Sequence, residues 1–165
     1  MTTAPHDFEK LLRELQNELI ARRATVATAE SCTGGLLAAY LTRQAGSSAV
    51  YLGGVSAYAN SVKERMLGVD AATLVRVGAV SAEVAAAMAH GARTRIGADY
   101  AVSLTGVAGP GGGSRDKPVG TVFGAVASAT ETRALQWLFP GDREAVRQAA
   151  AHAALTALAA MIKGE

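Results

Sequence analysis

The sequence predicts an α/β fold, in which a single domain has a central mixed sheet covered by helices on both faces. Helical apolar patterns stand at both ends of the chain, and short apolar runs of strand length lie between them, separated by glycine-rich turns. Apolar strands of this kind are typical of a sheet that is covered on both faces. The length of 165 residues suits one domain with its own core, and no linker or internal repeat divides residues 1–165.

The first predicted element is an amphipathic helix over residues 6–22. Its apolar face repeats at intervals of three and four residues and consists of Phe8, Leu11, Leu12, Leu15 and Leu19. The β-prone run 25–30 predicts a strand, and residues 33–44 predict a helix after it. Ser31 and Cys32 are therefore expected at a strand-to-helix turn.

A second strand is predicted over residues 50–58, where the pair Gly53-Gly54 indicates a bulge or a close approach of two backbones. Asn60 is expected to cap a short helix that ends at Leu67, because a glycine follows. Ser81 is expected to cap the next helix. The apolar residues of that helix recur every four positions, at Val84, Met88, Ala92 and Ile96.

The remaining strands are predicted from three apolar runs. Residues 100–104 predict a buried strand, and residues 119–128 and 134–139 predict two strands joined by a turn. Residues 106–118 are rich in glycine and contain two prolines, which predicts a loop. Asp142 is expected to cap a final helix. The apolar face of that helix consists of Val146, Ala150, Leu155, Leu158 and Ile162.

Charge and composition argue against several classes of protein. The net charge is only +2 and the basic residues are dispersed, so no nucleic-acid-binding surface is predicted. The one cysteine, Cys32, cannot form a disulfide within the chain, which fits a reducing compartment. The N-terminal segment lacks a signal-peptide pattern, and the apolar runs are interrupted well short of a membrane span. We therefore expect a cytoplasmic protein with neither nucleic acid nor membrane as a partner.

The predicted strand-to-helix turn carries two hydroxyl groups and a thiol. Backbone N–H groups at the start of a helix are unpaired and favour a phosphate or a developing oxyanion. Ser31 and Thr33 are therefore candidates for chemistry, although either residue can instead simply cap the helix. Cys32 has no histidine spaced to activate it, and no cluster of His, Cys or Asp has the spacing of metal ligands. The sequence thus predicts neither a catalytic thiol nor a metal site.

Three other places are candidates for function. Lys63 is either a solvated surface residue or a desolvated amine whose lowered pKa lets it take a proton from a serine. The glycine-rich loop 105–114 follows a buried strand, a usual place for a ligand, but it matches no nucleotide-binding fingerprint and is otherwise a flexible loop. Arg143 and Arg147 lie at the start of the last predicted helix, where the positive end of the helix dipole disfavours a positive charge. This placement indicates an anionic partner for them, either a phosphate or a neighbouring carboxylate.

Six segments of the chain, taken together and in order, resemble one known family. They are Glu30 to Gly35, Gly46-Ser47-Ser48, Tyr58 to Lys63, Gly78 to Ser81, Thr105 to Pro110 and Lys117 to Thr121. The chain resembles the CinA C-terminal domain family, whose enzymatic members are nicotinamide-nucleotide amidases. The likeness extends from residue 8 to residue 160, and the combination is far more specific than any one segment.

The resemblance implies hydrolysis of nicotinamide mononucleotide to nicotinate mononucleotide and ammonia, a step of pyridine nucleotide recycling that needs no metal or other cofactor. It implies that Ser31 is the nucleophile and Lys63 the base, with Tyr58 beside them. It also implies an α/β homodimer or higher homo-oligomer. The residues expected to bind the nucleotide substrate are Thr33, Gly46, Ser47, Ser48, Thr105, Gly106, Gly109 and Arg143.

A non-catalytic module is the alternative, because some family members form one part of a larger competence- or damage-associated protein. Ala59 and Ser61 stand where the family often has a serine and an acidic residue, which bears on the surroundings of Lys63. The intact Ser31 and Lys63 favour the enzyme. If they form a dyad, Ser31 Oγ and Lys63 Nζ should lie within ~3.5 Å of each other. Ser31 and Thr105 should then open on one pocket, within ~15 Å of each other.

Overall fold

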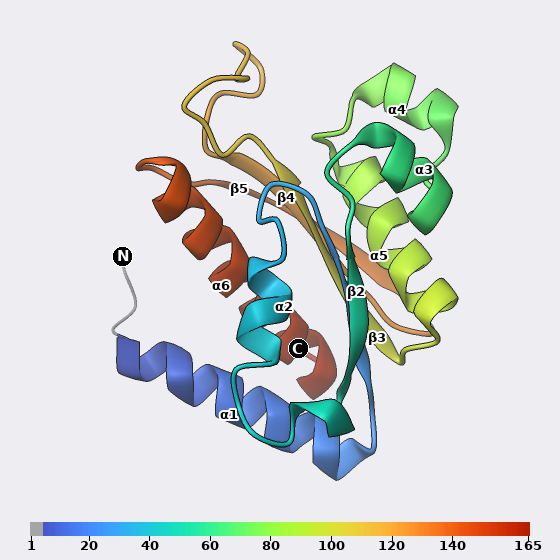
Figure 1. Ribbon diagram of the computed structural model, residues 1–165, viewed down its shortest axis with the longest axis vertical. Coiled ribbons are helices and arrows are strands. Elements are labelled where there is room, and N and C mark those ends of the chain that lie inside the picture. The colour runs from blue at the N-terminus through green and yellow to red at the C-terminus, as the bar shows by residue number, and fades with distance from the viewer. Residues whose placement is uncertain (1–4) are drawn as a thin grey trace.

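The computed structural model describes residues 5–165, in which one five-stranded sheet lies between two layers of helices (Figure 1). The strands follow the order β2-β1-β3-β4-β5. Their bounds are Val26–Glu30 (β1), Tyr51–Ser56 (β2), Tyr100–Gly106 (β3), Thr121–Ala127 (β4) and Thr132–Leu138 (β5). β1 pairs in parallel with both β2 and β3, whereas β4 is antiparallel to both β3 and β5. The predicted single α/β domain with a mixed sheet is confirmed.

Each face of the sheet is covered by three α-helices. One face carries α1 (Pro5–Arg22), α2 (Leu36–Leu41) and α6 (Arg143–Lys163), and its core is the larger of the two. The other face carries α3 (Asn60–Leu67), α4 (Ala71–Val77) and α5 (Ala82–Ile96), as Figure 1 shows. A short 3-10 helix, η1 (Ser47–Ala49), precedes β2. The predicted covering of both faces is thus confirmed.

The two faces of the sheet differ in the size of their side chains. Under α1, α2 and α6 the strands present larger residues such as Val26, Val102 and Leu104. Under α5 they present small residues, which are Ala27, Ala29, Ala101, Ala125 and Ala127. Small side chains let a helix lie close to a sheet. α5 therefore packs closely on the sheet, and α3, the helix that carries Lys63, packs in turn on α5.

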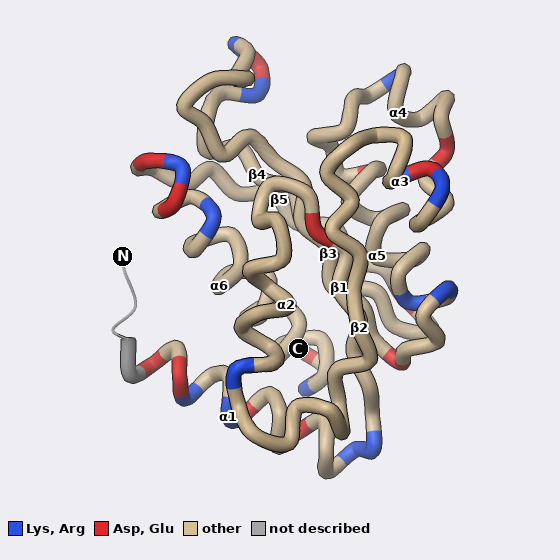
Figure 2. The backbone as a smooth tube through the Cα atoms, in the orientation of Figure 1, with Lys and Arg blue, Asp and Glu red and all other residues tan. Residues whose placement is uncertain are grey.

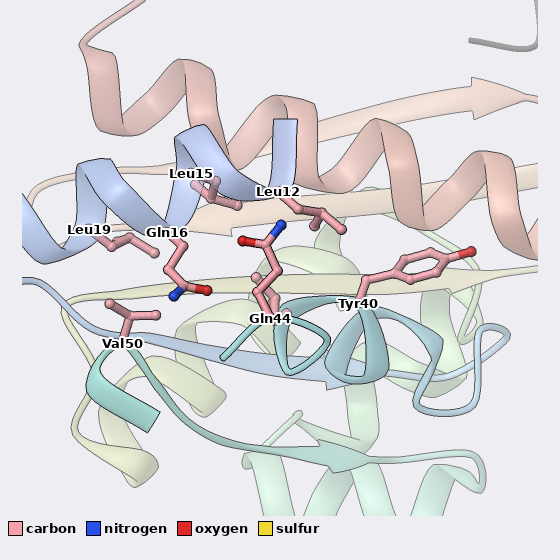
Figure 3. A pocket seen from close by; sticks show the side chains of 8 residues that line it. Leu12, Leu15, Gln16, Leu19, Tyr40, Gln44 and Val50 are labelled. Atoms are coloured by element: carbon pink, nitrogen blue, oxygen red, sulfur yellow. The ribbon is translucent and has the colours of Figure 1, made fainter. Parts of the chain in front are cut away.

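The amphipathic helix α1 packs through its predicted apolar face. Figure 3 shows Leu12, Leu15 and Leu19 pointing toward Tyr40 and Val50. The cavity between them measures only about 10 Å³, room for little more than one water molecule. This crevice is a packing seam and not a ligand site.

The last helix, α6, meets the length and mean hydropathy of a membrane-spanning helix, although polar residues interrupt its apolar runs. Its apolar residues are nevertheless core residues of this domain. Val146, Leu155 and Leu158 have no exposed surface, and they belong to the larger core. We therefore interpret α6 as the core helix of a globular fold.

Three local predictions were wrong. α2 begins at Leu36 and not at residue 33, because Gly34 and Gly35 adopt φ values of 60° and 101°, which a right-handed helix excludes. Asn60 is the first residue of α3 and not its cap. The helix α4 was not predicted, although Asp70 caps it by accepting a hydrogen bond from the backbone N–H of Thr73. The predicted caps Ser81 and Asp142 are both confirmed.

Gly91 gives a test of the close packing of α3 on α5. Gly91→Ala in the middle of a helix normally stabilises by about 1 kcal/mol. Here a Cβ would overlap the carbonyl oxygen of Leu67, the last residue of α3. We expect Gly91→Ala to lower the free energy of unfolding by about 1–3 kcal/mol, the usual range for overpacking. Urea denaturation measures it. The neighbouring exposed His90→Ala is the control and should be neutral, and a stabilised Gly91→Ala variant would contradict the packing described.

Candidate active site

The carboxyl ends of β1, β2 and β3 meet at one edge of the sheet, because the three strands run parallel. Ser31 directly follows β1, and its backbone N–H donates to the carbonyl of Leu104 in β3 at 2.9 Å. Ala57 directly follows β2, and its N–H donates to the carbonyl of Glu30 at 2.7 Å. The segments around Ser31, Tyr58 and Thr105, far apart in sequence, are therefore held side by side.

Ser31 and Lys63 are in direct contact at this edge. Lys63 Nζ lies 3.0 Å from Ser31 Oγ, although 32 positions separate the two residues. Lys63 is only 1% exposed, whereas Ser31 is partly open to solvent. Burial lowers the pKa of the Lys63 amine from its ordinary value of 10.5. A buried base thus stands behind an accessible hydroxyl.

The surroundings of Lys63 suit an uncharged amine. Nζ also donates to two backbone carbonyls, those of Ala57 at 2.7 Å and Tyr58 at 3.2 Å. Within residues 5–165 no carboxylate forms an ion pair with it. A neutral amine has two N–H groups for the two carbonyls and one lone pair for the hydroxyl of Ser31. The geometry therefore lets Nζ accept the proton of Ser31.

Glu30 shapes the turn that presents Ser31, a role that the sequence analysis missed. Its carboxylate is 1% exposed and accepts hydrogen bonds from the N–H groups of Gly35 at 3.1 Å, Leu37 at 3.0 Å and Ala38 at 2.9 Å. The negative charge also complements the start of the α2 dipole. The only sequence signal was an acidic residue just before a helix. The expectation that the helix N–H groups stay free for a ligand was wrong at these three positions.

In the turn after Ser31, some backbone N–H groups have an acceptor in another residue of the described chain, and two, those of Cys32 and Thr33, do not. Gly34 donates to the carbonyl of Ser31, and Leu36 donates to that of Thr33. Among the described residues, the N–H groups of Cys32 and Thr33 donate to no other residue. The Thr33 hydroxyl, on a side chain with no exposed surface, likewise has no partner in the described part of the chain. Free N–H groups beside a nucleophile are the usual donors to an oxyanion.

The thiol next to Ser31 is poorly suited to act as the nucleophile in its place. Cys32 is 5% exposed, and burial is the main cause that raises the pKa of its thiol to about 11. A thiol with so high a pKa is almost entirely protonated near neutral pH and is a poor nucleophile. In the described part of the chain, no group of three or more His, Cys, Asp or Glu side chains is placed to hold a metal ion.

Arg143 joins three segments around the pair. Its guanidinium donates to the carbonyl of Gly109 at 2.7 Å and to the hydroxyl of Tyr58 at 2.9 Å. Both Arg143 and Tyr58 are exposed. The glycine-rich loop, the start of α6 and the segment after β2 thus form one rim. Arg147 has the neighbouring carboxylate as partner, since it pairs with Glu144 at 2.6 Å and also donates to the Thr33 carbonyl.

Thr105 and Gly106 lie at this edge of the sheet, but other residues of the chain already use the Thr105 hydroxyl proton and fill the space beside Gly106. The Thr105 hydroxyl donates to the carbonyl of Ala79 at 2.8 Å, which leaves its oxygen only as an acceptor. A Cβ at Gly106 would lie 2.7 Å from the carbonyl oxygen of Thr121, so a glycine is needed for the close pairing of β3 with β4. These residues shape the site mainly through the backbone.

Gly46, Ser47 and Ser48 do not join the site within one chain, and the expectation that they lie near the reacting amide was wrong in this respect. They precede β2, and Val50 pairs with Val26 at the start of β1. Six strand residues separate the two ends of β2, about 20 Å at the usual rise per residue. Gln16 of α1 holds this segment by donating to the Ala45 carbonyl at 2.9 Å.

Comparisons with known proteins agree with this architecture. The family model of the CinA C-terminal domain matches residues 8–162. A CinA-like protein from Mycolicibacterium vanbaalenii is 53% identical over 150 residues, which is 89% of this chain and 35% of that protein. One from Anaeromyxobacter dehalogenans is 54% identical over 140 residues, 85% of this chain and 34% of that protein. The chain thus spans about a third of the length of these curated relatives.

Solved structures are similar over nearly the whole chain. The competence/damage inducible protein CihA from Agrobacterium tumefaciens superposes with a TM-score of 0.92 at 44% identity, covering 97% of this chain and 98% of that one. A CinA superfamily protein from Klebsiella pneumoniae gives a TM-score of 0.91 at 38% identity, covering 96% and 99%. From the matched family model and these identities, the chain belongs to the CinA C-terminal domain family.

Proposed function

We propose that this domain hydrolyses the amide of nicotinamide mononucleotide, producing nicotinate mononucleotide and ammonia, with Ser31 as nucleophile and Lys63 as base. The observation that carries the proposal is the contact of 3.0 Å between Ser31 Oγ and a buried Nζ with no carboxylate partner in residues 5–165. The resemblance supports the choice of substrate. It also supports the further proposals of a cytoplasmic location and of a homodimer or higher homo-oligomer.

The reaction begins when neutral Lys63 takes the hydroxyl proton of Ser31. Oγ then forms a bond to the amide carbon, and the carbonyl oxygen becomes an oxyanion that the free N–H groups of Cys32 and Thr33 are placed to stabilise. The protonated amine of Lys63 gives its proton to the amide nitrogen, the C–N bond breaks, and ammonia leaves. Lys63 then takes a proton from water, and the resulting hydroxide attacks the ester on Ser31. The ester C–O bond breaks, Lys63 returns the proton to Ser31 Oγ, and the carboxylate product leaves.

The rim formed by Arg143, Tyr58 and the loop at Gly109 offers a place for the nucleotide. Guanidinium is suited to bind phosphate through paired N–H donors. Arg143 is exposed and already oriented by its bonds to the Gly109 carbonyl and the Tyr58 hydroxyl. A phosphate held there would fix the substrate while its amide lies over Ser31.

A purely non-catalytic module would have little reason to bury an amine without an anionic partner. Removing a charged group from water costs several kcal/mol unless it is paired or neutral. Such a cost is common at catalytic sites, where it produces the pKa that the chemistry needs. The environment of Lys63 therefore favours the enzyme over the binding module.

The dyad is tested by single and double substitutions. Ser31→Ala and Lys63→Ala should each lower kcat for ammonia release from nicotinamide mononucleotide by about 100-fold or more, the usual contribution of a nucleophile–base pair. The double variant should be hardly worse than either single variant, since the two residues act as one unit. Lys10→Ala, at an exposed lysine of α1, is the control. A folded Lys63→Ala variant with near wild-type kcat would refute the mechanism.

The pH dependence tests the protonation state of Lys63. Only the unprotonated amine accepts a proton, and its fraction grows as pH rises toward and past the lowered pKa. We therefore expect kcat to rise with pH and to level off below the ordinary lysine pKa of 10.5. Lys63→Arg should stay inactive at every pH, because guanidinium keeps its proton. A kcat that is flat or falls with rising pH, or an active Lys63→Arg variant, would exclude Lys63 as the base.

The choice between the adjacent hydroxyl and thiol is tested at Cys32. Cys32→Ala should retain kcat within about fivefold of the wild type, because a buried thiol with a pKa of about 11 supplies little thiolate. Some loss of stability is expected, since the thiol belongs to the larger core. Steady-state kinetics on the folded variant measures the outcome. A loss of activity as complete as that of Ser31→Ala would make Cys32 the nucleophile.

A further inference from the structure

A second, larger cavity lies at the opposite end of the sheet from Ser31. It has a volume of about 460 Å³ and is bounded by the end of α1, the start of β3 and the turn between β4 and β5. β3 separates it from the dyad by seven residues, about 23 Å at the usual rise. The volume is within the range of small-molecule sites, about 300–1,000 Å³. Three arginines line it, and we name it the arginine cavity: Arg22, Arg23 and Arg93.

Two of these arginines have no partner for their guanidinium in the described part of the chain. Nε of Arg93 is buried and makes no hydrogen bond there. Arg23 likewise makes no side-chain hydrogen bond or ion pair with residues 5–165, whereas Arg22 pairs with Glu18 at 2.6 Å. A buried N–H group without an acceptor is destabilising. The fold itself thus provides no acceptor for the buried Nε of Arg93.

The acidic residues that line the arginine cavity are already occupied. Asp99 accepts hydrogen bonds from the N–H and the hydroxyl of Thr25, both at 2.8 Å. Glu131 forms an ion pair with Arg133 at 3.2 Å. Neither carboxylate is bonded to Arg23 or Arg93. The cavity therefore combines two arginines that have no ion-pair partner with two carboxylates that are already hydrogen-bonded elsewhere, and an added anion would find free guanidinium donors.

Arg23 also has an unusual backbone. Its φ of 52° lies in the left-handed region, and it is the one non-glycine residue with a positive φ among the described residues. This conformation ends α1, because the backbone N–H groups of Arg23 and Ala24 turn back to donate to the carbonyls of Ile20 at 3.0 Å and Leu19 at 2.9 Å. Arginines near helix ends often cap the last carbonyls. The side chains do not do so here, because neither the guanidinium of Arg23 nor that of Arg93 donates to a carbonyl of the described chain.

We propose that the arginine cavity binds a small molecule through a diphosphate group. Arg23 follows α1, and Arg93 belongs to the last turn of α5 on the other face of the sheet, so the two guanidinium groups approach the cavity from different elements. Each guanidinium can hold one phosphate by paired N–H donors. Tyr100 and Met161, which also line the cavity, offer apolar surface for the remainder of the ligand. This site is independent of the proposed amidase.

The test uses inorganic pyrophosphate as probe and calorimetry at low ionic strength, where ion pairing is least screened. All titrations use the full chain with Arg143→Met, so that the proposed phosphate position near Ser31 contributes little. We expect saturable binding, weakened about tenfold or more by Arg93→Met, which removes charge-assisted hydrogen bonds. Arg23→Asn should weaken it similarly, since asparagine tolerates the left-handed backbone. Inorganic phosphate should bind more weakly than pyrophosphate.

The control is Arg43→Gln, which removes an arginine that lies outside the cavity and pairs with Glu9. Its pyrophosphate affinity should equal that of the parent. Thermal unfolding checks each variant, and if Arg93→Met does not fold, the exposed Arg23→Asn decides the question. Absence of saturable binding, unchanged affinity in the cavity variants, or an equal loss in Arg43→Gln would overturn the proposal.

Discussion

The parallel pairing of β1 with both of its neighbours is the constraint on which the rest of the site depends. Parallel strands end at the same edge of a sheet, so the segments after β1, β2 and β3 are brought together whatever their separation in sequence. Ser31 follows β1, Tyr58 follows β2 closely, and Thr105 lies near the end of β3. The helices on the two faces then add their own residues to this edge, with Lys63 from α3 and Arg143 from α6.

Two buried ionisable groups at this edge, Glu30 and Lys63, have opposite kinds of hydrogen-bond partner. Glu30 receives three backbone N–H groups at the start of α2, an arrangement that supports a carboxylate. Lys63 Nζ donates to two backbone carbonyls and contacts the hydroxyl of Ser31, but it has no ion-pair partner within residues 5–165. Glu30 thus holds the turn in place, while the burial of Lys63 lowers its pKa. Glu30, next to Ser31, therefore serves to position the nucleophile, whereas Lys63 itself is the group that burial makes reactive.

The two ends of the sheet have different electrostatic character. At one end Arg143 is oriented by a carbonyl and a phenol, and Arg147 by a carboxylate and a carbonyl. At the other end Arg23 and Arg93 line a cavity, and their guanidinium groups have no hydrogen-bond acceptor in the described chain. Figure 2 shows basic residues at the end of α1 and in the last turn of α5, away from the edge that carries Ser31. Arginines therefore lie at both ends of the same sheet, in different surroundings.

Local patterns in the sequence were sufficient for most of the elements. The spacing of leucines in α1, the caps Ser81 and Asp142, and the glycine pair in β2 were all predicted, because each depends on residues near one another in the chain. The bulge is seen as a register shift against β1, and a Cβ at Gly54 would overlap the Thr28 hydroxyl. The family resemblance added Ser31 and Lys63 as a pair.

Only the tertiary structure decided how distant residues meet. α2 starts only after Gly34 and Gly35, and the carboxylate of Glu30 accepts hydrogen bonds from the N–H groups at this start, a contact that no local pattern expresses. Within one chain Gly46 to Ser48 lie at the end of the sheet opposite Ser31, because strand direction, and not motif order, places them. Arg143 and Tyr58 are 85 positions apart, yet they are hydrogen-bonded. Sequence determines which side chains and local conformations are available, whereas strand pairing decides which of them face one another, since it acts across the whole length of the chain.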